Sequence, residues 1–345
     1  MQTMKRSKIT FDEMFSIDAL YQAAMDASKG KKHYKSVINF EEHRDEILNN
    51  IYNLLHSGNY RTYGYIEEII NEHGKERRIM KLQFAPHRIV QCALINGLKD
   101  DFLNKFYPES YAAIPRKGMH LAAKRLRQYI LANPAKSQWC YKIDFAKYFD
   151  SINQSLLIKS MKDFVKDSRI IAIIIEIITS ISKGIPIGNY TSQYFANQFL
   201  TRFDKLVSKI CGYFSRYMDD CVFICKSRSE ANRVRHEVEY IVEHDLCLKI
   251  KPSWSIFSVV QRGIDFVGFR IFFNAVILRK SLYNDIVRTC RRVKSILARR
   301  GFINTSEKSA VMSYWGWALH CTNKARHTIY QMHFKPIFNI IKVEL

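Results

Sequence analysis

Most of this chain carries apolar side chains at intervals of three and four residues, the spacing that predicts amphipathic helices. We expect helices within residues 10–56, 86–106, 119–132 and 226–244 and from residue 281 to the end, with the basic segment 28–35 as a loop inside the first stretch. The last of these stretches is strongly basic, which predicts a separate helical lobe after about residue 275.

Strand-like alternation occupies shorter segments. A hairpin is expected within residues 60–84, with its turn at His73 and Gly74. Residues 139–152 begin as a strand and pass into a helix, and short strands are expected through residues 263–273. Residues 215–225 read as a second hairpin.

Composition and charge favour a globular protein with a polyanionic partner. The 345 residues are 47% apolar, and Lys plus Arg outnumber Asp plus Glu by 54 to 32, a formal net charge of +22. Because phosphate neutralisation releases counterions, this balance favours nucleic acid.

The cysteines and the chain start exclude several classes. None of the eight cysteines forms a CxxC pair, which argues against a zinc ribbon or a thioredoxin-like site. The start has no apolar signal core, and the most apolar run, residues 170–181, contains Glu176 and is too short to span a bilayer. We expect buried thiols, a buried helix in that run, and a cytoplasmic protein with no membrane partner.

Two adjacent carboxylates, Asp219 and Asp220, lie near the turn of the second hairpin, and no Lys or Arg stands directly beside them. Two ionised carboxylates about 4 Å apart repel by roughly 4 kcal/mol at an effective dielectric near 20. Exposure to water would relieve this, and so would a divalent metal with hard oxygen ligands. Asp144 ends an apolar strand and would otherwise be a helix cap. With Asp219 it could share two ions that stabilise the attacking and leaving oxygens of an in-line phosphoryl displacement.

Three blocks together resemble the palm of a reverse transcriptase. They are "DFAKYFDSI" from Asp144, "KGIPIGNYTSQYFANQFL" from Lys183, and "YMDD" from Tyr217, in the order of that family. The resemblance extends from about Tyr65 to Leu345. It implies an α+β fold of the right-hand polymerase type, with an antiparallel palm sheet. Fingers and an N-terminal extension would occupy residues 1–138, the palm 139–275 and a C-terminal helical thumb 276–345. The palm would contain a helical insertion at about 153–182.

The resemblance also assigns roles to residues. Asp144, Asp219 and Asp220 would be the catalytic carboxylates and, with the backbone carbonyl of Phe145, would bind two Mg²⁺ ions, for which Mn²⁺ could substitute. Phe149 would exclude a ribose 2′-OH, so that deoxynucleotides (dNTPs) are selected. The other nucleotide-binding residues implied are Lys75, Arg77, Arg88, Ile187, Gly188, Gln193, Tyr217 and Met218. The primer- and template-binding residues implied are Arg116, Lys117, His120, Phe266, Gly268, Phe269, Arg291 and Arg292.

The block around Gly188 also has a direct physical interpretation. Gly188 permits a tight turn into a helix that Asn189 or Thr191 could cap. Phe195, Phe199 and Phe203 recur at four-residue spacing and predict the packed stripe of that helix. Gly188, Ser192 and Ala196 are all small, which predicts room for a base pair on another face.

In one respect the chain departs from the family. Many relatives place a lysine that is proposed to protonate pyrophosphate where this chain has Ser253 and Trp254, with Lys249 and Lys251 earlier. The assignment of a general acid therefore stays open.

The motif from Ile187 to Gln193 looks like that of reverse transcriptases from diversity-generating retroelements of bacteria and phages. That subtype implies a template RNA, an RNA–cDNA duplex, mutagenic copying opposite adenine, and a small, basic, oligomeric accessory protein. The alternative within the superfamily is a phage-defence reverse transcriptase. From other classes, a two-metal nuclease and a non-catalytic RNA-binding protein remain open, since both would explain part of the pattern.

Overall fold

The computed structural model describes residues 6–72 and 75–341 and divides the chain into two compact units, each built from three segments. Unit 1 comprises residues up to Pro108, Asp144–Lys209 and Glu237–Pro252; unit 2 comprises Glu109–Ile143, Ile210–His236 and Ser253 onward. The units are thus interleaved along the sequence, and the division into three consecutive domains stays a prediction.

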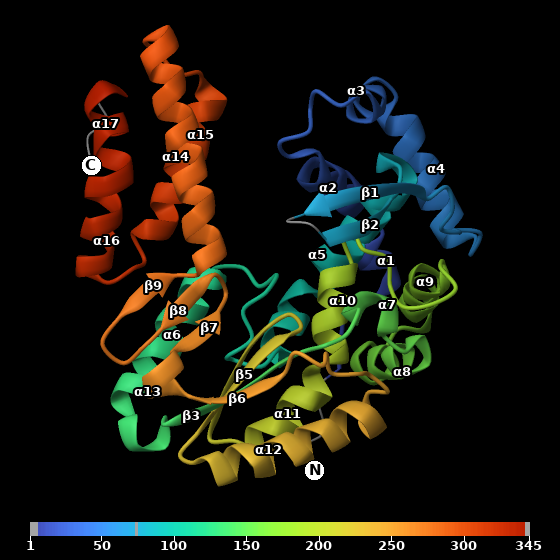
Figure 1. Ribbon diagram of the computed structural model, residues 1–345. Coiled ribbons are helices and arrows are strands. Elements are labelled where there is room, and N and C mark those ends of the chain that lie inside the picture. Colours follow the sequence, from blue (N-terminus) through green and yellow to red (C-terminus); the bar gives the residue numbers. More distant parts are fainter. Residues whose placement is uncertain (1–5, 73–74, 342–345) are drawn as a thin grey trace. The chain divides into compact units, whose positions relative to one another are not determined.

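Unit 1 is mainly helical. Its elements are α1 (Phe11–Met14), α2 (Ile17–Ser28), α3 (Lys35–Glu42), α4 (Arg44–His56), β1 (Ile66–Glu72), β2 (Lys75–Lys81), η1 (Phe84–Arg88), α5 (Ile89–Lys105), α7 (Tyr148–Ser151), α8 (Gln154–Phe164), α9 (Ser168–Thr179), α10 (Ser192–Phe199), most of α11 (Thr201–Ile210) and η3 (Ile241–Asp245). The expected hairpin is present, with β1 antiparallel to β2 and Ile66 opposite Lys81 (Figure 1). Its predicted turn, His73 and Gly74, lies outside the described residues.

The apolar run expected as a buried helix is α9, in which Ile170, Ile174 and Ile178 are fully buried. The helix begins where the Asp167 carboxylate accepts hydrogen bonds from the backbone N–H groups of Arg169 and Ile170, a side-chain cap that satisfies otherwise unpaired donors.

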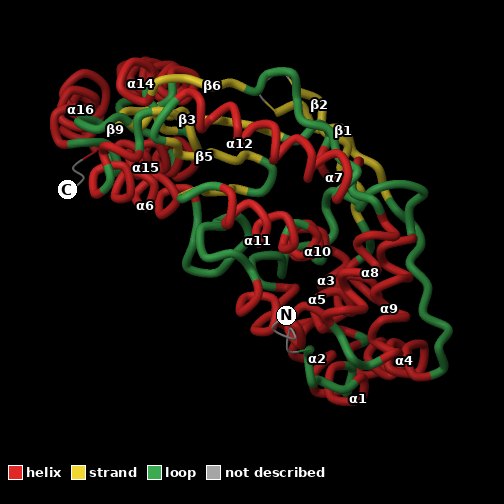
Figure 2. Tube along the Cα trace, turned by 90° about the horizontal axis from the view of Figure 1, so that it is seen from below, coloured by secondary structure: helices red, strands yellow, loops and turns green. Residues whose placement is uncertain are grey.

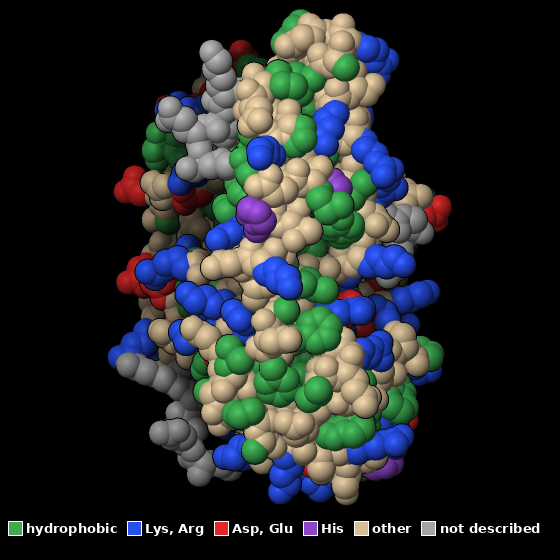
Figure 3. Space-filling model, turned by 60° about the vertical axis from the view of Figure 1, so that its left-hand side comes forward, with side chains coloured by type: hydrophobic (Ala, Val, Ile, Leu, Met, Phe, Trp, Pro, Cys, Tyr) green, Lys and Arg blue, Asp and Glu red, His purple; other side chains and the backbone are tan. Residues whose placement is uncertain are grey.

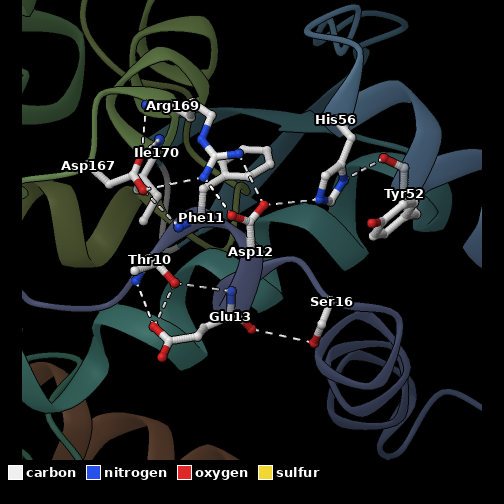
Figure 4. A network of polar contacts seen from close by, with 10 residues as sticks. All are labelled: Thr10, Phe11, Asp12, Glu13, Ser16, Tyr52, His56, Asp167, Arg169 and Ile170. Atoms are coloured by element: carbon white, nitrogen blue, oxygen red, sulfur yellow. Dashed lines mark hydrogen bonds and ion pairs between the residues drawn. The ribbon is translucent and has the colours of Figure 1, made fainter.

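The N-terminal helix α1 is fastened to the start of α9 by polar contacts (Figure 4). Asp167 also accepts from the backbone N–H of Phe11 at 2.9 Å, and the Arg169 guanidinium donates to both carboxylate oxygens of Asp12 at 3.0 and 2.7 Å. Hydrogen bonding to Arg169 lowers the pKa of Asp12 below its usual value. These contacts join two segments that are more than 150 residues apart in the sequence.

Unit 2 contains two antiparallel sheets and most of the C-terminal helices. Its elements are α6 (Met119–Ala132), η2 (Pro134–Lys136), β3 (Trp139–Asp144), β4 (Tyr213–Tyr217), β5 (Asp220–Cys225), the start of α12 (Arg228–Tyr240), β6 (Ser255–Ser258), α13 (Val259–Arg262), β7 (Ile264–Phe266), β8 (Phe269–Ile271), β9 (Val276–Leu278), α14 (Lys280–Arg300), α15 (Thr305–Ala318), α16 (Asn323–Ile329), η4 (Tyr330–Phe334) and α17 (Lys335–Ile341). The strand orders are β4-β5-β3-β6 and β7-β8-β9. The last residue of β3, Asp144, is counted with unit 1.

One face of the β4-β5-β3-β6 sheet packs on the core of unit 2. Cys140 on β3 and Val222 and Ile224 on β5 join a buried cluster with Phe266 and Phe269 of the second sheet. The helices α14, α15 and α17 complete this cluster, and α14 lies beside both α15 and α17 in Figure 1. Helix α6 packs on β4 and β8, and Figure 2 shows it close to the strands. The predicted α+β class and C-terminal helical segment are confirmed.

Two general expectations can also be compared with the structure. All eight cysteines lie in the described part of the chain and are unbridged; seven are buried, and Cys247 is exposed. Among the described residues, no helix is both long enough and apolar enough to span a membrane.

Candidate active site

The second hairpin is present as predicted, and its loop has two residues. Tyr217 at the end of β4 pairs with Asp220 at the start of β5, and Met218 and Asp219 form the loop between them. Met218 has φ 55°, a left-handed conformation that a non-glycine residue adopts only where its surroundings hold it. The side chain of Arg216, fully buried, donates from Nη1 to the Met218 carbonyl oxygen at 3.0 Å. This contact holds the loop that carries Asp219.

A lysine lies beside Asp220, the second aspartate of the pair. Lys142 on β3 places its Nζ 3.2 and 3.3 Å from the two carboxylate oxygens of Asp220. No Lys or Arg stands directly beside the carboxylate pair in the sequence, but Lys142, 78 positions before Asp220, reaches it from another strand of the same sheet. Since Lys142 is near the end of β3 and Asp220 begins β5, these two strand ends lie together.

Asp144 ends β3, as predicted, and has a lysine partner of its own. Lys251 Nζ lies 2.6 Å from Asp144 Oδ2, and the Lys251 backbone N–H donates to the Asp144 carbonyl at 2.8 Å. The Ala146 backbone N–H donates to the Lys249 carbonyl at 2.8 Å. These two backbone hydrogen bonds therefore use the carbonyls of Asp144 and Lys249 but not the carbonyl of Phe145. The lysine whose role the sequence left open thus lies against the first carboxylate.

One carboxylate oxygen of the predicted site lacks a protein partner. Asp144 Oδ1 is buried and has no hydrogen-bond partner among the described residues, so it is a free hard ligand of the kind that a divalent cation takes. Within the described residues, no three His, Cys, Asp or Glu side chains are grouped closely enough to hold a metal ion. The assignment of metals to Asp144, Asp219, Asp220 and the Phe145 carbonyl therefore stays a proposal.

The turn before α10 is tied to β2. Ile187 accepts a hydrogen bond from the Met80 backbone N–H at 2.7 Å, and Gly188 follows with φ 115°. A Cβ on Gly188 would lie 2.8 Å from the Met80 carbonyl oxygen, so glycine is required both for conformation and for space. Asn189 donates from Nδ2 to the Tyr65 hydroxyl at 2.9 Å.

The expectations for α10 had different outcomes. The side-chain cap was wrong, because Thr191 precedes the helix but makes no capping hydrogen bond through its side chain, and Asn189 bonds Tyr65 instead. Of the three small residues, Gly188 is exposed, whereas Ser192 and Ala196 are buried, and room for a base pair there stays a prediction. Phe195, Phe199 and Phe203 are buried as predicted, although Phe203 belongs to the next helix, α11.

The residues expected to bind the nucleotide differ in exposure. Arg77 and Gln193 are exposed; Phe149, Ile187, Tyr217 and Arg88 are half-buried; Met218 is buried. The Arg88 guanidinium lies 5.2 Å from the centre of the Tyr190 ring. Lys75 lies at the first position of β2, and its side chain is outside the described part of the structure.

The residues expected to bind primer and template differ in burial. Arg116, Arg291 and Arg292 are exposed cations, whereas Phe266 and Phe269 are fully buried on either side of the β7–β8 turn that contains Gly268. Phe266 and Phe269 can therefore shape the turn but do not present their rings at the surface.

Lys117 and His120 are partly enclosed within unit 2. Lys117 donates to the Ser110 carbonyl at 3.2 Å, and burial lowers its pKa. His120 stacks on His320 with ring centres 3.8 Å apart and also contacts Trp317. Burial lowers the pKa of His120, which disfavours the cation that would contact a phosphate.

Two residues of this region were missed from the sequence. Lys142 stands two positions before Asp144, and strand alternation puts both side chains on one face. Arg216 is a single charge within an otherwise buried strand, a pattern that signals a special partner. Neither partner could be identified from spacing alone. Figure 3 shows Lys and Arg side chains spread over the face it presents, in keeping with the net charge.

Comparisons with known proteins identify the family. The family described as "Reverse transcriptase (RNA-dependent DNA polymerase)" matches residues 70–271. "Protein YkfC" of Escherichia coli strain K12 is 21% identical over 288 residues, covering 70% of this chain and 72% of that protein.

Solved structures with some likeness are telomerases of two Candida species. Apo telomerase of Candida tropicalis has a TM-score of 0.48 and 12% identity, covering 78% of this chain and 56% of that one. Candida albicans telomerase, solved with a fragment of telomeric RNA, has a TM-score of 0.47 and 10% identity, and the match covers 81% of this chain and 58% of that one. This chain thus spans little more than half the length of those telomerases. The family match, which includes both carboxylate blocks and extends over more than half of the sequence, shows that the chain belongs to the reverse transcriptase family.

Proposed function

We propose that this chain is an RNA-directed DNA polymerase that extends a primer with deoxynucleotides in a reaction assisted by two divalent metal ions. The observation that carries the proposal is the contact of Lys142 with Asp220, which brings the end of β3 beside the start of β5. Lys142 and Asp144 are two residues apart on β3 and so share one face of it. This supports convergence of Asp144 with Asp219 and Asp220.

Different residues would serve metal binding, triphosphate orientation and sugar selection during nucleotide addition. Enzymes of this family use divalent metal ions, and when bound at Asp144, Asp219 and Asp220 such ions would stabilise the charge that develops on the transferring phosphoryl group. The cations Lys75, Arg77 and Arg88 would orient the triphosphate by charge-assisted hydrogen bonds. Phe149 would close the space that a ribose 2′-OH needs.

Primer extension on an RNA template tests this proposal. We expect growth of the DNA primer that requires dNTPs and a divalent ion, at least about a 100-fold loss of rate in Asp219→Asn, and unchanged RNA affinity in that variant. Asp150→Asn changes an exposed carboxylate on α7 and serves as the matched control. Shortening of the substrate would favour a nuclease instead, and RNA binding without extension would favour a non-catalytic RNA-binding protein.

For the biological setting, we propose a diversity-generating retroelement enzyme that copies a template-repeat RNA with errors opposite adenine. The support is Ile187, which stands where many relatives carry an amide-bearing Gln beside the nascent base pair. Removing that hydrogen-bonding group would weaken selection against mispairs. A small basic accessory protein would then be a partner.

Sequencing of the cDNA tests the setting separately from the polymerase activity. Errors concentrated at template adenines would support the retroelement proposal. Errors spread evenly over the four template bases would contradict it and would favour the phage-defence alternative.

A further inference from the structure

We propose that Lys142 is a positioning residue. It would fix the catalytic carboxylate Asp220 relative to the β7–β8 hairpin and, through Asp265, relative to the start of helix α14. This inference rests on the proposed polymerase function and adds to it a connection between the site of chemistry and the elements expected to hold the primer. All the residues involved belong to unit 2.

The connection begins at the lysine amine. Lys142 Nζ lies 3.2 Å from Asp220 Oδ1 and also donates to the backbone carbonyl of Asp265, on β7. An ammonium group has three N–H donors, and these two contacts direct them toward β5 and toward β7. The side chains of Lys142 and Asp220 are 22% and 25% exposed, so the pair is screened less than a surface ion pair.

The connection continues through the Asp265 carboxylate. Arg279 donates from Nε to Asp265 Oδ1 at 2.6 Å, and its backbone N–H donates to the Gly268 carbonyl at 2.8 Å. Arg279 immediately precedes α14, so the carboxylate and the turn of the hairpin both fix the beginning of that helix.

Four elements are thereby joined in a single polar chain. It runs from β5 (Asp220) to β3 (Lys142), then to β7 (Asp265), and finally to the residue before α14 (Arg279). Phe266 and Phe269, beside the same turn, are fully buried and cannot contact a primer with their rings. The position of the hairpin backbone relative to Asp220 is therefore what would align a primer end, and Lys142 sets that position.

Single-turnover primer extension with Lys142→Met tests the proposal, since methionine replaces the stem of lysine but cannot donate. At a temperature at which circular dichroism shows the variant to be folded, we expect the maximal rate to fall about 10- to 100-fold, as a misplacement on the order of 1 Å would produce, with little change in template–primer affinity. Lys142→Arg keeps a cationic donor and should recover part of the rate that Lys142→Met loses. Lys226→Met, an exposed lysine after β5, is the control for loss of positive charge.

A double-mutant cycle distinguishes a connected chain from separate packing roles. Arg279→Met should also lower the rate, and the double variant Lys142→Met/Arg279→Met should be no slower than the slower single variant, because both changes break one chain. Independent, multiplying losses would overturn the proposal. So would a Lys142→Met enzyme that matches Lys226→Met in rate. A wild-type protein without any extension activity would instead contradict the polymerase assignment itself.

Discussion

Arg216 and Met218 are joined by a hydrogen bond of 3.0 Å that runs from a fully buried guanidinium to the carbonyl of a loop residue with positive φ. The left-handed conformation of Met218 is disfavoured for a side chain of this size, so the loop keeps its shape because buried groups fix it. Asp219, the next residue, is oriented by the same loop.

Arg216→Met should therefore affect both stability and catalysis. We expect unfolding free energy to fall by about 2–4 kcal/mol, since the Met218 carbonyl loses a charged donor inside the protein. Polymerase activity should be lost at temperatures at which the variant is still folded. Urea denaturation followed by circular dichroism measures the first effect, with Lys205→Met, an exposed site on α11, as the control. A variant of normal stability and normal rate would show that Arg216 does not hold the loop.

Gly188→Ala tests the junction between β2 and the turn before α10. The added Cβ would lie 2.8 Å from the Met80 carbonyl oxygen at a φ of 115°, so we expect a loss of about 1–3 kcal/mol. Gly212→Ala is the matched control because its nearest neighbouring atom, the Tyr129 hydroxyl, would be 3.8 Å away. Equal denaturation midpoints for the two variants would argue against a close approach at Gly188.

Phe149→Ala should relax sugar selection. Removing the ring opens the space that a 2′-OH would occupy, and we expect ribonucleotide incorporation to rise by about 10- to 100-fold relative to deoxynucleotide incorporation. Primer extension with each nucleotide type measures the ratio. Tyr148→Phe keeps its ring and loses the hydroxyl that donates to Ala196, so its ratio should equal that of the wild type. An unchanged ratio in Phe149→Ala would remove this residue from the nucleotide site.

Ile187→Gln should reduce errors opposite template adenine if the side chain at this position checks the nascent pair. The backbone of Ile187 is already fixed by its hydrogen bond to Met80, so the substitution changes only the side chain. Sequencing of cDNA made by the variant, by the wild type and by Ile66→Gln, a change at an exposed residue of β1, gives the comparison. The same error spectrum in all three enzymes would show that the Ile187 side chain does not influence fidelity.

The stacked rings of His120 and His320 should make unit 2 sensitive to acid. Burial lowers the pKa of both imidazoles below the ordinary value of 6.5. Below about pH 6.5 the unfolded chain therefore binds more protons than the folded chain. This contribution to stability is complete above about pH 6.5 and declines as the pH falls below it.

Urea denaturation at pH 7.5 and pH 5.5 measures this dependence. We expect a lower midpoint at pH 5.5 in the wild type and a smaller difference between the two pH values in His320→Gln. His327→Gln, on the exposed face of α16, should keep the wild-type difference. If His320→Gln retained the full difference, the acid sensitivity would have to come from other groups.

The sequence was sufficient for features that depend on neighbours along the chain. The β4–β5 hairpin, the strand that ends at Asp144 and the buried helix α9 all follow from local alternation or periodicity. It was insufficient where a partner comes from far away. The pairing of Lys142 with Asp220 requires the strand order, and the hydrogen bond from Tyr148 to the Ala196 carbonyl joins residues 48 positions apart. Side-chain capping by Thr191 failed for the same reason, since contacts across the fold already fix the turn before α10.

The exposure of Cys247 gives the protein a native attachment point for a thiol-reactive fluorophore. The seven other thiols are enclosed, so labelling of the folded wild-type chain should be confined to this position without removal of any cysteine. Cys247 lies four residues before Lys251, the partner of Asp144. A dye there would report on that segment as template, primer and nucleotide are added in turn.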